Sequence, residues 1–166
     1  EFRRVLFRSS PGHFLQFQHL RSARSALRRS GLFAAQAVVE GWAHYGEQLM
    51  IERGFARRDA AIHLGQLGEA LLRLVRLVVG IRLHTEDLSV EHGVRLFREH
   101  ALLEESSARR EAERGTYDPG YVVYALGRLM LLKLRRDVEA QQGDRFSLRD
   151  FHDAFLANGV LPMPAH

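Results

Sequence analysis

The side chains best suited to chemistry in this sequence are Glu40, His44 and Glu47. Steps of four and three residues place them on one face of a helix. A histidine and a carboxylate one helical turn apart can share a proton or bind one metal ion, and zinc takes imidazole and carboxylate ligands where thiolate is absent. The same composition is also typical of a hydrogen-bonded or solvated helix surface. The spacing alone leaves both interpretations open.

Two other segments hold chemically capable side chains. The first is Pro11-Gly12-His13, and the second is a group of tyrosines around Pro119-Gly120. A single histidine is more often structural than a metal ligand, and aromatic residues at the start of a helix more often pack than react. The chain contains no HExxH sequence, and its nine histidines offer no further metal-binding spacing.

The elements that must position these residues are predicted to be helices. Apolar residues recur at three- and four-residue steps, and no segment alternates at the period of a strand. Asp59, Ser89 and Ser147 are predicted N-caps, and Gly54 is predicted to end a helix. We expect an all-α domain with about six or seven helices, over residues 11–29, 32–53, 59–81, 89–97, 102–114, 120–141 and 147–158. The helix over 59–81 is so apolar that we expect its neighbours to enclose it.

Length and composition limit the classes of protein to which this chain can belong. A chain of 166 residues with 46% hydrophobic residues suits one globular domain. The absence of cysteine excludes a disulfide framework, a thiolate zinc site and a cysteine nucleophile. No run of about 18 uncharged apolar residues exists, so no membrane span is expected.

The basic charge has an origin other than ligand binding. Of the 24 basic residues only Lys133 is a lysine, which indicates a GC-rich coding sequence. Residues 1–9, EFRRVLFRS, resemble the in-frame translation of a sequencing adapter, and we set them apart as a foreign segment. They carry three arginines and one glutamate, so the formal charge falls from +4 to +2 without them. Basic residues are spread among acidic ones, as in Glu104–Arg114, so nucleic acid is not expected as a partner.

Several blocks of sequence, in order, resemble the bacterial family called domain of unknown function 885. The resemblance covers Ser10 to Pro162 and rests on PGHFLQ, VVEGWAHYGEQLM, GQLGEALLRLVRLVVGIRLHT, LFREHALLEESSARREAERGTYDPGYVVYALGRLMLLKLR and FSLRDFHDAFLANGVLP. That family is grouped with gluzincin-type zinc metallopeptidases, which are helical around the metal. Its members are longer, so residues 10–166 are expected to form the C-terminal portion of one helical, zincin-like domain.

The resemblance implies a set of metal ligands. The first block of the family reads HExxPGH, which places its first histidine and its glutamate at Phe7 and Arg8 here. His13 corresponds to the second histidine, and Glu40 to the third zinc ligand. An undistorted helix would point positions six residues apart in different directions, so we expect a kink or bulge at Pro11-Gly12.

The resemblance suggests roles for five more residues, each with an ordinary structural alternative. His44 would orient Glu40 or bind substrate, and Glu47 would hold a histidine in one tautomer or be solvated. Tyr121 and Tyr124 would donate to the oxyanion of a tetrahedral intermediate or simply pack. His84 would reach the cleft or, as we prefer, interact with carbonyls at its own helix end.

These expectations define a function. The parent protein would be a zinc peptidase that hydrolyses peptide bonds through a metal-activated water. This chain would be inactive, because the general base and one ligand are missing. It would also lack an N-terminal part that it packs against, so we expect exposed apolar faces and self-association. The alternatives are a non-catalytic helical interaction module and an arginine-rich binder of anionic ligands or nucleic acid.

Overall fold

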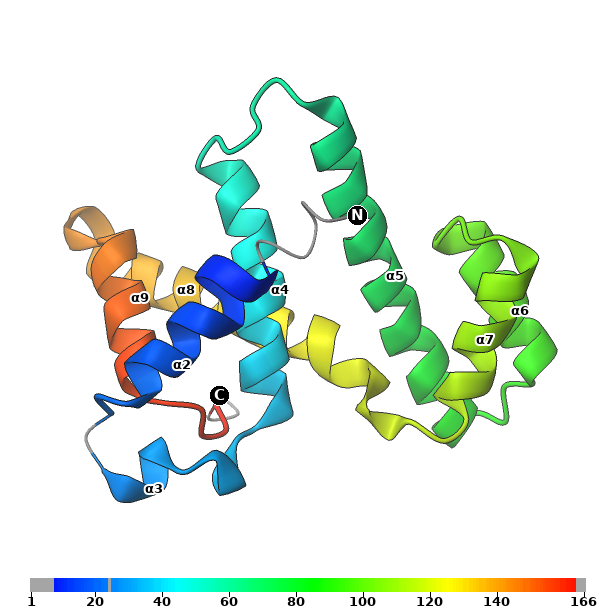
Figure 1. The fold of residues 1–166 in the computed structure, drawn as a ribbon, viewed down its shortest axis with the longest axis horizontal. Coiled ribbons are helices and arrows are strands. Elements are labelled where there is room, and N and C mark those ends of the chain that lie inside the picture. Colours follow the sequence, from blue (N-terminus) through cyan, green and yellow to red (C-terminus); the bar gives the residue numbers. More distant parts are fainter. Residues whose placement is uncertain (1–7, 24, 164–166) are drawn as a thin grey trace.

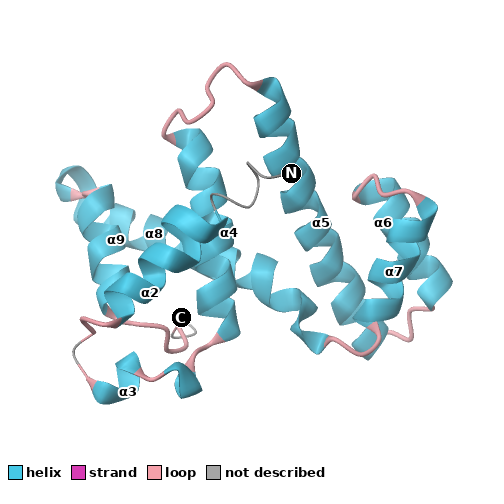
Figure 2. Ribbon diagram, in the orientation of Figure 1, coloured by secondary structure: helices cyan, strands magenta, loops and turns pink. Residues whose placement is uncertain are grey.

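The computed structural model describes residues 8–23 and 25–163, and these residues form helices and loops without strands (Figures 1 and 2). The described chain is all-α, which confirms the predicted fold class. Its eight α-helices are α2 (Phe14–Leu20), α3 (Ala26–Arg29), α4 (Gln36–Glu52), α5 (Ala60–Thr85), α6 (Val90–His100), α7 (Glu105–Gly115), α8 (Val123–Gln142) and α9 (Leu148–Ala157). Tighter or wider turns occupy η1 (Arg8–His13), η2 (Gly31–Phe33), η3 (Pro119–Val122) and η4 (Gly143–Arg145).

Short polar residues begin the helices where the sequence predicts. Asp59 accepts hydrogen bonds from the backbone N–H groups of Ala61 and Ile62, and Ser89 and Ser147 each accept one in the first turns of α6 and α9. These bonds satisfy donors that would otherwise lack partners at a helix start. Gly54 follows α4 with a φ of 88°, a left-handed conformation that glycine adopts at little cost.

The first predicted helix is wrong in extent. Instead of one helix over 11–29, α2 ends at Leu20 and α3 is a single turn capped by Ser25. The hydroxyl of Ser22 donates to the carbonyl of His19, and that of Ser25 accepts from the N–H of Arg28. Serine side chains that bond to nearby backbone groups in this way compete with continuation of a helix.

Two clusters of buried side chains form the core. One joins α4, α8 and α9 around Trp42, Leu131 and Phe155. The other joins α5, α6 and α7 around Val79, Phe97 and Ala112. Figure 1 shows α6 and α7 beside α5 on one side of the molecule, and α4, α8 and α9 on the other.

Helix α5 is not enclosed, contrary to the sequence prediction. Among its residues only five are buried, and two of those are glycines. Several leucines on the opposite face are exposed, including Leu64 at 69% and Leu67 at 55%. Composition predicted the apolar surface correctly, but the described part of the chain covers one side of it only.

Candidate metal centre

The site begins at the turn η1, where the backbone leaves the helical path twice. Ser10 is extended (φ −137°, ψ 118°), Gly12 has a ψ of −115°, and the Ser10–Pro11 peptide is cis. The predicted Pro-Gly kink is therefore present. Because the chain turns here, the side chains of Arg8 and His13 reach one another across it, with Arg8 Nε 3.5 Å from His13 Nε2.

Trp42 fixes this turn against α4. Its indole N–H donates to the carbonyl of Gly12 at 3.0 Å, with the carbonyl of Pro11 at 3.3 Å, and its ring stacks on Phe155 of α9 at 5.6 Å. The amide of Gln16, which is buried, donates to the carbonyl of Val38. These bonds join the segment that carries His13 to the helix that carries Glu40. Sequence reasoning assigned Trp42 no role, so this positioning contact was missed.

His13 and Glu40 face one another. Nε2 of His13 lies 3.7 Å from Oε2 of Glu40, and the two side chains keep exposed fractions of 25% and 17%. Two ligand atoms that each lie about 2.0–2.2 Å from one zinc ion are separated by a comparable distance. The pair that the sequence singled out is thus brought together, with side chains that solvent can reach.

Arg8 occupies the space beside this pair. Its guanidinium donates to Oε2 of Glu40 and lies over the ring of Tyr124, 5.4 Å from the ring centre. The positive charge that an ion would bring to Glu40 is supplied here by an arginine. Sequence reasoning set Arg8 aside as part of a foreign segment and did not anticipate that its side chain would lie in the site.

The charges around His13 favour its neutral form. Burial lowers the pKa of His13, and the positive charge of Arg8 lowers it further, while the carboxylate of Glu40 opposes them. Burial also lowers the pKa of Arg8, but the charge of Glu40 and the interactions with Tyr124 together outweigh burial, so the net pKa is raised. A neutral imidazole is the form that binds a metal.

His44 lies deeper, below the pair. Its exposed fraction is 1%, its Nδ1 contacts the carbonyl of Tyr124 at 3.3 Å, and its Nε2 has no hydrogen-bond partner. Burial lowers the pKa of His44 to about 3, and the charges of Arg73 and Arg128 contribute. This histidine is neutral and contacts the backbone beside Tyr124, not the carboxylate of Glu40.

Glu47 forms a buried ion pair instead of holding a histidine. Both of its oxygens accept from Arg73, at 2.6 and 3.0 Å, and both residues are 5% exposed. Burial raises the pKa of Glu47 and the charge of Arg73 opposes that rise. Glu47 is neither solvated nor bonded to His13 or His44. An arginine inside the apolar sequence of α5 was the signal that could have revealed this pair.

Tyr121 and His84 belong to a different part of the molecule. The hydroxyl of Tyr121 donates to Glu111, at 2.7 Å from its carboxylate, and burial raises the pKa of Tyr121. Nε2 of His84 lies 3.0 Å from the carbonyl of Gly115. That carbonyl ends α7, so His84 contacts a neighbouring helix end and not its own. Of the two tyrosines, only Tyr124 lies beside His13 and Glu40 through Arg8.

His13 and Glu40 are the two candidate metal ligands, and the described residues place no third one beside them. Across residues 8–23 and 25–163, no group of three or more His, Asp or Glu side chains is arranged to hold a metal ion. Phe7, the position that matches the first histidine of the expected motif, lies outside the described residues. The pair amounts to two of the three protein ligands that the expected motif would supply, with Arg8 beside Glu40.

The described chain is an all-α protein in which a kinked Pro-Gly-His segment lies against a glutamate of the next long helix. The chain belongs to the family described as "Bacterial protein of unknown function (DUF885)", whose profile matches residues 9–165. The match begins just after Arg8. A search of curated proteins finds no match to the chain.

Two solved structures have a similar fold. One is of a putative lipoprotein of unknown function from Shewanella oneidensis, with a TM-score of 0.88, 23% identity, and coverage of 97% of this chain and 30% of that one. The other is of a putative lipoprotein from Colwellia psychrerythraea, with a TM-score of 0.84, 38% identity, and coverage of 92% of this chain and 26% of that one. The chain therefore spans less than a third of the length of these structures. In its described part, no helix is long and apolar enough to cross a membrane.

Proposed function

We propose that this chain carries two ligands of a zinc-peptidase site, His13 and Glu40, and that it does not itself hydrolyse peptides. The observation that carries the proposal is the 3.7 Å separation of His13 Nε2 and Glu40 Oε2, from segments 27 residues apart in sequence. A zinc ion bound there would lower the pKa of a water molecule and polarise a peptide carbonyl.

The residues of the chain have separable tasks in this proposal. Neutral His13 and the carboxylate of Glu40 hold the ion, and Trp42 keeps the two segments in register through Gly12. The Tyr124 ring lies under the Arg8 guanidinium, so its hydroxyl is the nearer candidate for donation to an oxyanion. No described carboxylate is left beside the pair as a general base, because Glu47 is engaged by Arg73.

The arginines give little support to a nucleic-acid or anion binder. Several of them are already paired with carboxylates of the chain, as in Arg76–Glu111, Arg82–Glu86, Arg109–Glu91 and Arg114–Asp118. Neutralised in this way, they do not form the free basic stripe that phosphate binding requires.

A pair of substitutions tests the proposal. The double variant Phe7→His with Arg8→Glu restores the expected HExxPGH motif, and we expect it to bind about one zinc ion per chain while the unaltered chain binds none. Binding at a concentration of 100 times Kd should stabilise the variant by about 2.7 kcal/mol. Isothermal titration calorimetry and thermal unfolding with and without zinc measure these effects.

The matched control adds His13→Ala to the same double variant. We expect zinc binding to weaken by at least about 100-fold, because one of three ligands is lost. The unaltered chain should show no zinc-dependent peptide hydrolysis. Turnover by that chain, or zinc binding that is unaffected by His13→Ala, would refute the proposal.

A further inference from the structure

Helix α5 has apolar side chains on two sides: Val75 and Val79 pack in the core with α6 and α7, and a second set faces solvent. Two of its arginines, Arg73 and Arg76, also point inward, to ion pairs with Glu47 and Glu111. From Ala60 to Ile81, every exposed residue of the helix is alanine, glycine, leucine, valine or isoleucine. A helix normally shows its apolar side to the core. Here a second apolar side faces solvent, so that side is suited to contact with another protein surface.

The exposed residues are spaced as a helix-pairing seam. They are Leu64, Leu67, Leu71, Leu74, Val78 and Ile81, each at least 36% exposed. The steps alternate three, four, three, four and three, which is the seven-residue repeat of helices that pack along their length. We call these six residues the α5 stripe. A second helix that lies along α5 can follow this spacing over the whole length of the stripe.

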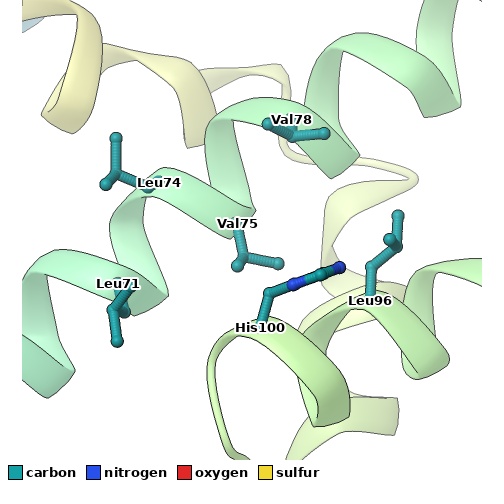
Figure 3. A pocket seen from close by; sticks show the side chains of 6 residues that line it. All are labelled: Leu71, Leu74, Val75, Val78, Leu96 and His100. Carbon is teal, nitrogen blue, oxygen red and sulfur yellow. The ribbon is translucent and has the colours of Figure 1, made fainter.

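A hollow lies along one edge of the α5 stripe. It has a volume of about 190 Å³ and lies between α5 and α6, lined by Leu71, Leu74, Val75, Val78, Leu96 and His100. Figure 3 shows leucine and valine side chains of α5 with Leu96 and His100 of α6 across from them. Apart from His100 the lining is aliphatic, so an inserted leucine side chain would meet hydrocarbon and would leave no polar group unpaired.

We propose that the α5 stripe binds a second copy of this chain, with the two α5 helices antiparallel across a two-fold axis. The stripe is self-complementary under that operation, because its spacing reads the same in both directions. Leu64 would pack opposite Ile81 of the other copy, Leu67 opposite Val78, and Leu71 opposite Leu74. The exposed α5 residues from 60 to 81 bear no charge, so no like charges would meet along the seam.

The area of the α5 stripe sets the expected affinity of the dimer. Six side chains exposed at 36–69% amount to an apolar face of about 500 Å², the range in which exposed patches mark interaction sites. Two copies would bury about 1,000 Å² in total, which is at the lower limit for a specific interface. We therefore expect a reversible dimer with a dissociation constant on the order of micromolar.

Sedimentation velocity across a concentration series tests the dimer. Leu71→Glu places two carboxylates in the seam and should raise the dissociation constant at least tenfold. Leu64→Glu, at a more exposed position, should have the same direction of effect, and circular dichroism shows whether each variant folds. Leu32→Glu is the control, because Leu32 is 92% exposed and lies outside the stripe; it should leave the dissociation constant unchanged.

Cysteine pairing tests the antiparallel arrangement, and the chain has no native cysteine to interfere. Positions 64 and 81 lie about 25 Å apart along a helix. Under mild oxidation, a mixture of Leu64→Cys and Ile81→Cys chains should yield the mixed disulfide, and Leu64→Cys alone should yield little dimer. A monomer at all concentrations, or equal weakening by Leu32→Glu, would overturn the proposal. Rapid homodimer formation by Leu64→Cys alone would overturn the antiparallel arrangement.

Discussion

At the residue scale, Arg8 determines what His13 and Glu40 can bind. A guanidinium and a divalent cation compete for the same carboxylate oxygen, because both are positive and both need Oε2 of Glu40. An ion that displaced Arg8 would have to replace its hydrogen bond to Glu40 and would gain His13 as a second ligand. With two ligands instead of three, that exchange is not favourable for zinc.

The buried imidazole of His44 should make the protein sensitive to acid. Its pKa is about 3 in the folded chain and about 6.5 in an unfolded one, so below pH 6.5 the unfolded chain binds a proton that the folded chain does not. Stability should therefore fall as the pH drops from 6.5 toward 3, by about 1.4 kcal/mol per pH unit from this group. Urea unfolding at pH 7 and pH 4.5 measures the loss.

His44→Asn is the matched variant, because an asparagine amide can still donate toward the Tyr124 carbonyl. Other groups titrate equally in both chains, so the difference between the two acid losses isolates His44. We expect the variant to lose about 2–3 kcal/mol less than the unaltered chain over this interval. Equal losses in the two chains would show that His44 is protonated in the folded state.

Removing one partner of the buried Arg73–Glu47 pair should lower the free energy of unfolding strongly. Arg73→Met leaves a buried carboxylate without its cation, and we expect a loss of about 3–5 kcal/mol in the free energy of unfolding. Arg82→Met removes an exposed pair with Glu86 and should cost less than about 1 kcal/mol. Chemical unfolding of both variants makes the comparison; similar losses would contradict the assigned burial of Arg73.

The sequence predicted part of this site. His13 and Glu40 were identified from their place in a family motif, and the Pro-Gly kink followed from the backbone properties of proline and glycine. Arg73 inside the apolar sequence of α5 signalled a buried charge, but residue types could not show that its partner is Glu47, because the two residues lie 26 positions apart on different helices. For the same reason the hydrogen bond of Tyr121 to Glu111 could not be foreseen, and the two tyrosines looked equivalent.

At the element scale, close contact between α4 and α8 holds Glu40 in place. Gly41 and Gly127 face one another, and a Cβ on Gly127 would lie 1.8 Å from the carbonyl oxygen of Ala37. Backbone cannot yield as a flexible side chain does, so the helices must move apart to admit a methyl group. The two helix backbones are too close at Gly41 and Gly127 to admit any side chain. These glycines therefore let α4 pack on α8 next to Glu40, the candidate ligand that precedes Gly41.

A pair of glycine substitutions tests this contact. Gly127→Ala should destabilise the fold by about 3 kcal/mol through overpacking. Gly46→Ala, in α4 where no atom lies within 4 Å of the added Cβ, should stabilise it by about 0.5–1 kcal/mol because alanine favours the helix. Thermal or urea unfolding gives both values, and the same sign for the two would contradict the packing of α4 on α8.

Local sequence signals predicted where helices begin better than they predicted which helices pack together. Helix starts at Asp59, Ser89 and Ser147 were correct because a cap depends on a few adjacent residues. The split between α2 and α3 was missed, since serines in this segment bond to the backbone in a way that the apolar spacing does not reveal. The enclosure of α5 was wrong because composition shows that a face is apolar without showing what covers it.

At the scale of the whole molecule, the described helices form two clusters with α5 exposed along one side. The similar structures contain more than three times the matched length, and in the 38% identical one this chain corresponds to 26% of that chain. Within the described residues, the candidate donor set lacks a third ligand and the α5 stripe lacks a covering helix. A complete zinc site would require a further histidine and a carboxylate, whereas the α5 stripe requires only an apolar helix. Each proposal can therefore fail without affecting the other.

The central claim is that His13 and Glu40 are the two ligands that this chain contributes to a zinc site. Anomalous scattering from zinc in crystals of the Phe7→His, Arg8→Glu double variant would locate the ion directly. We expect one ion within about 2.0–2.2 Å of Nε2 of His13 and of a carboxylate oxygen of Glu40. An ion bound elsewhere, or no ion at this pair at saturating zinc, would contradict the claim.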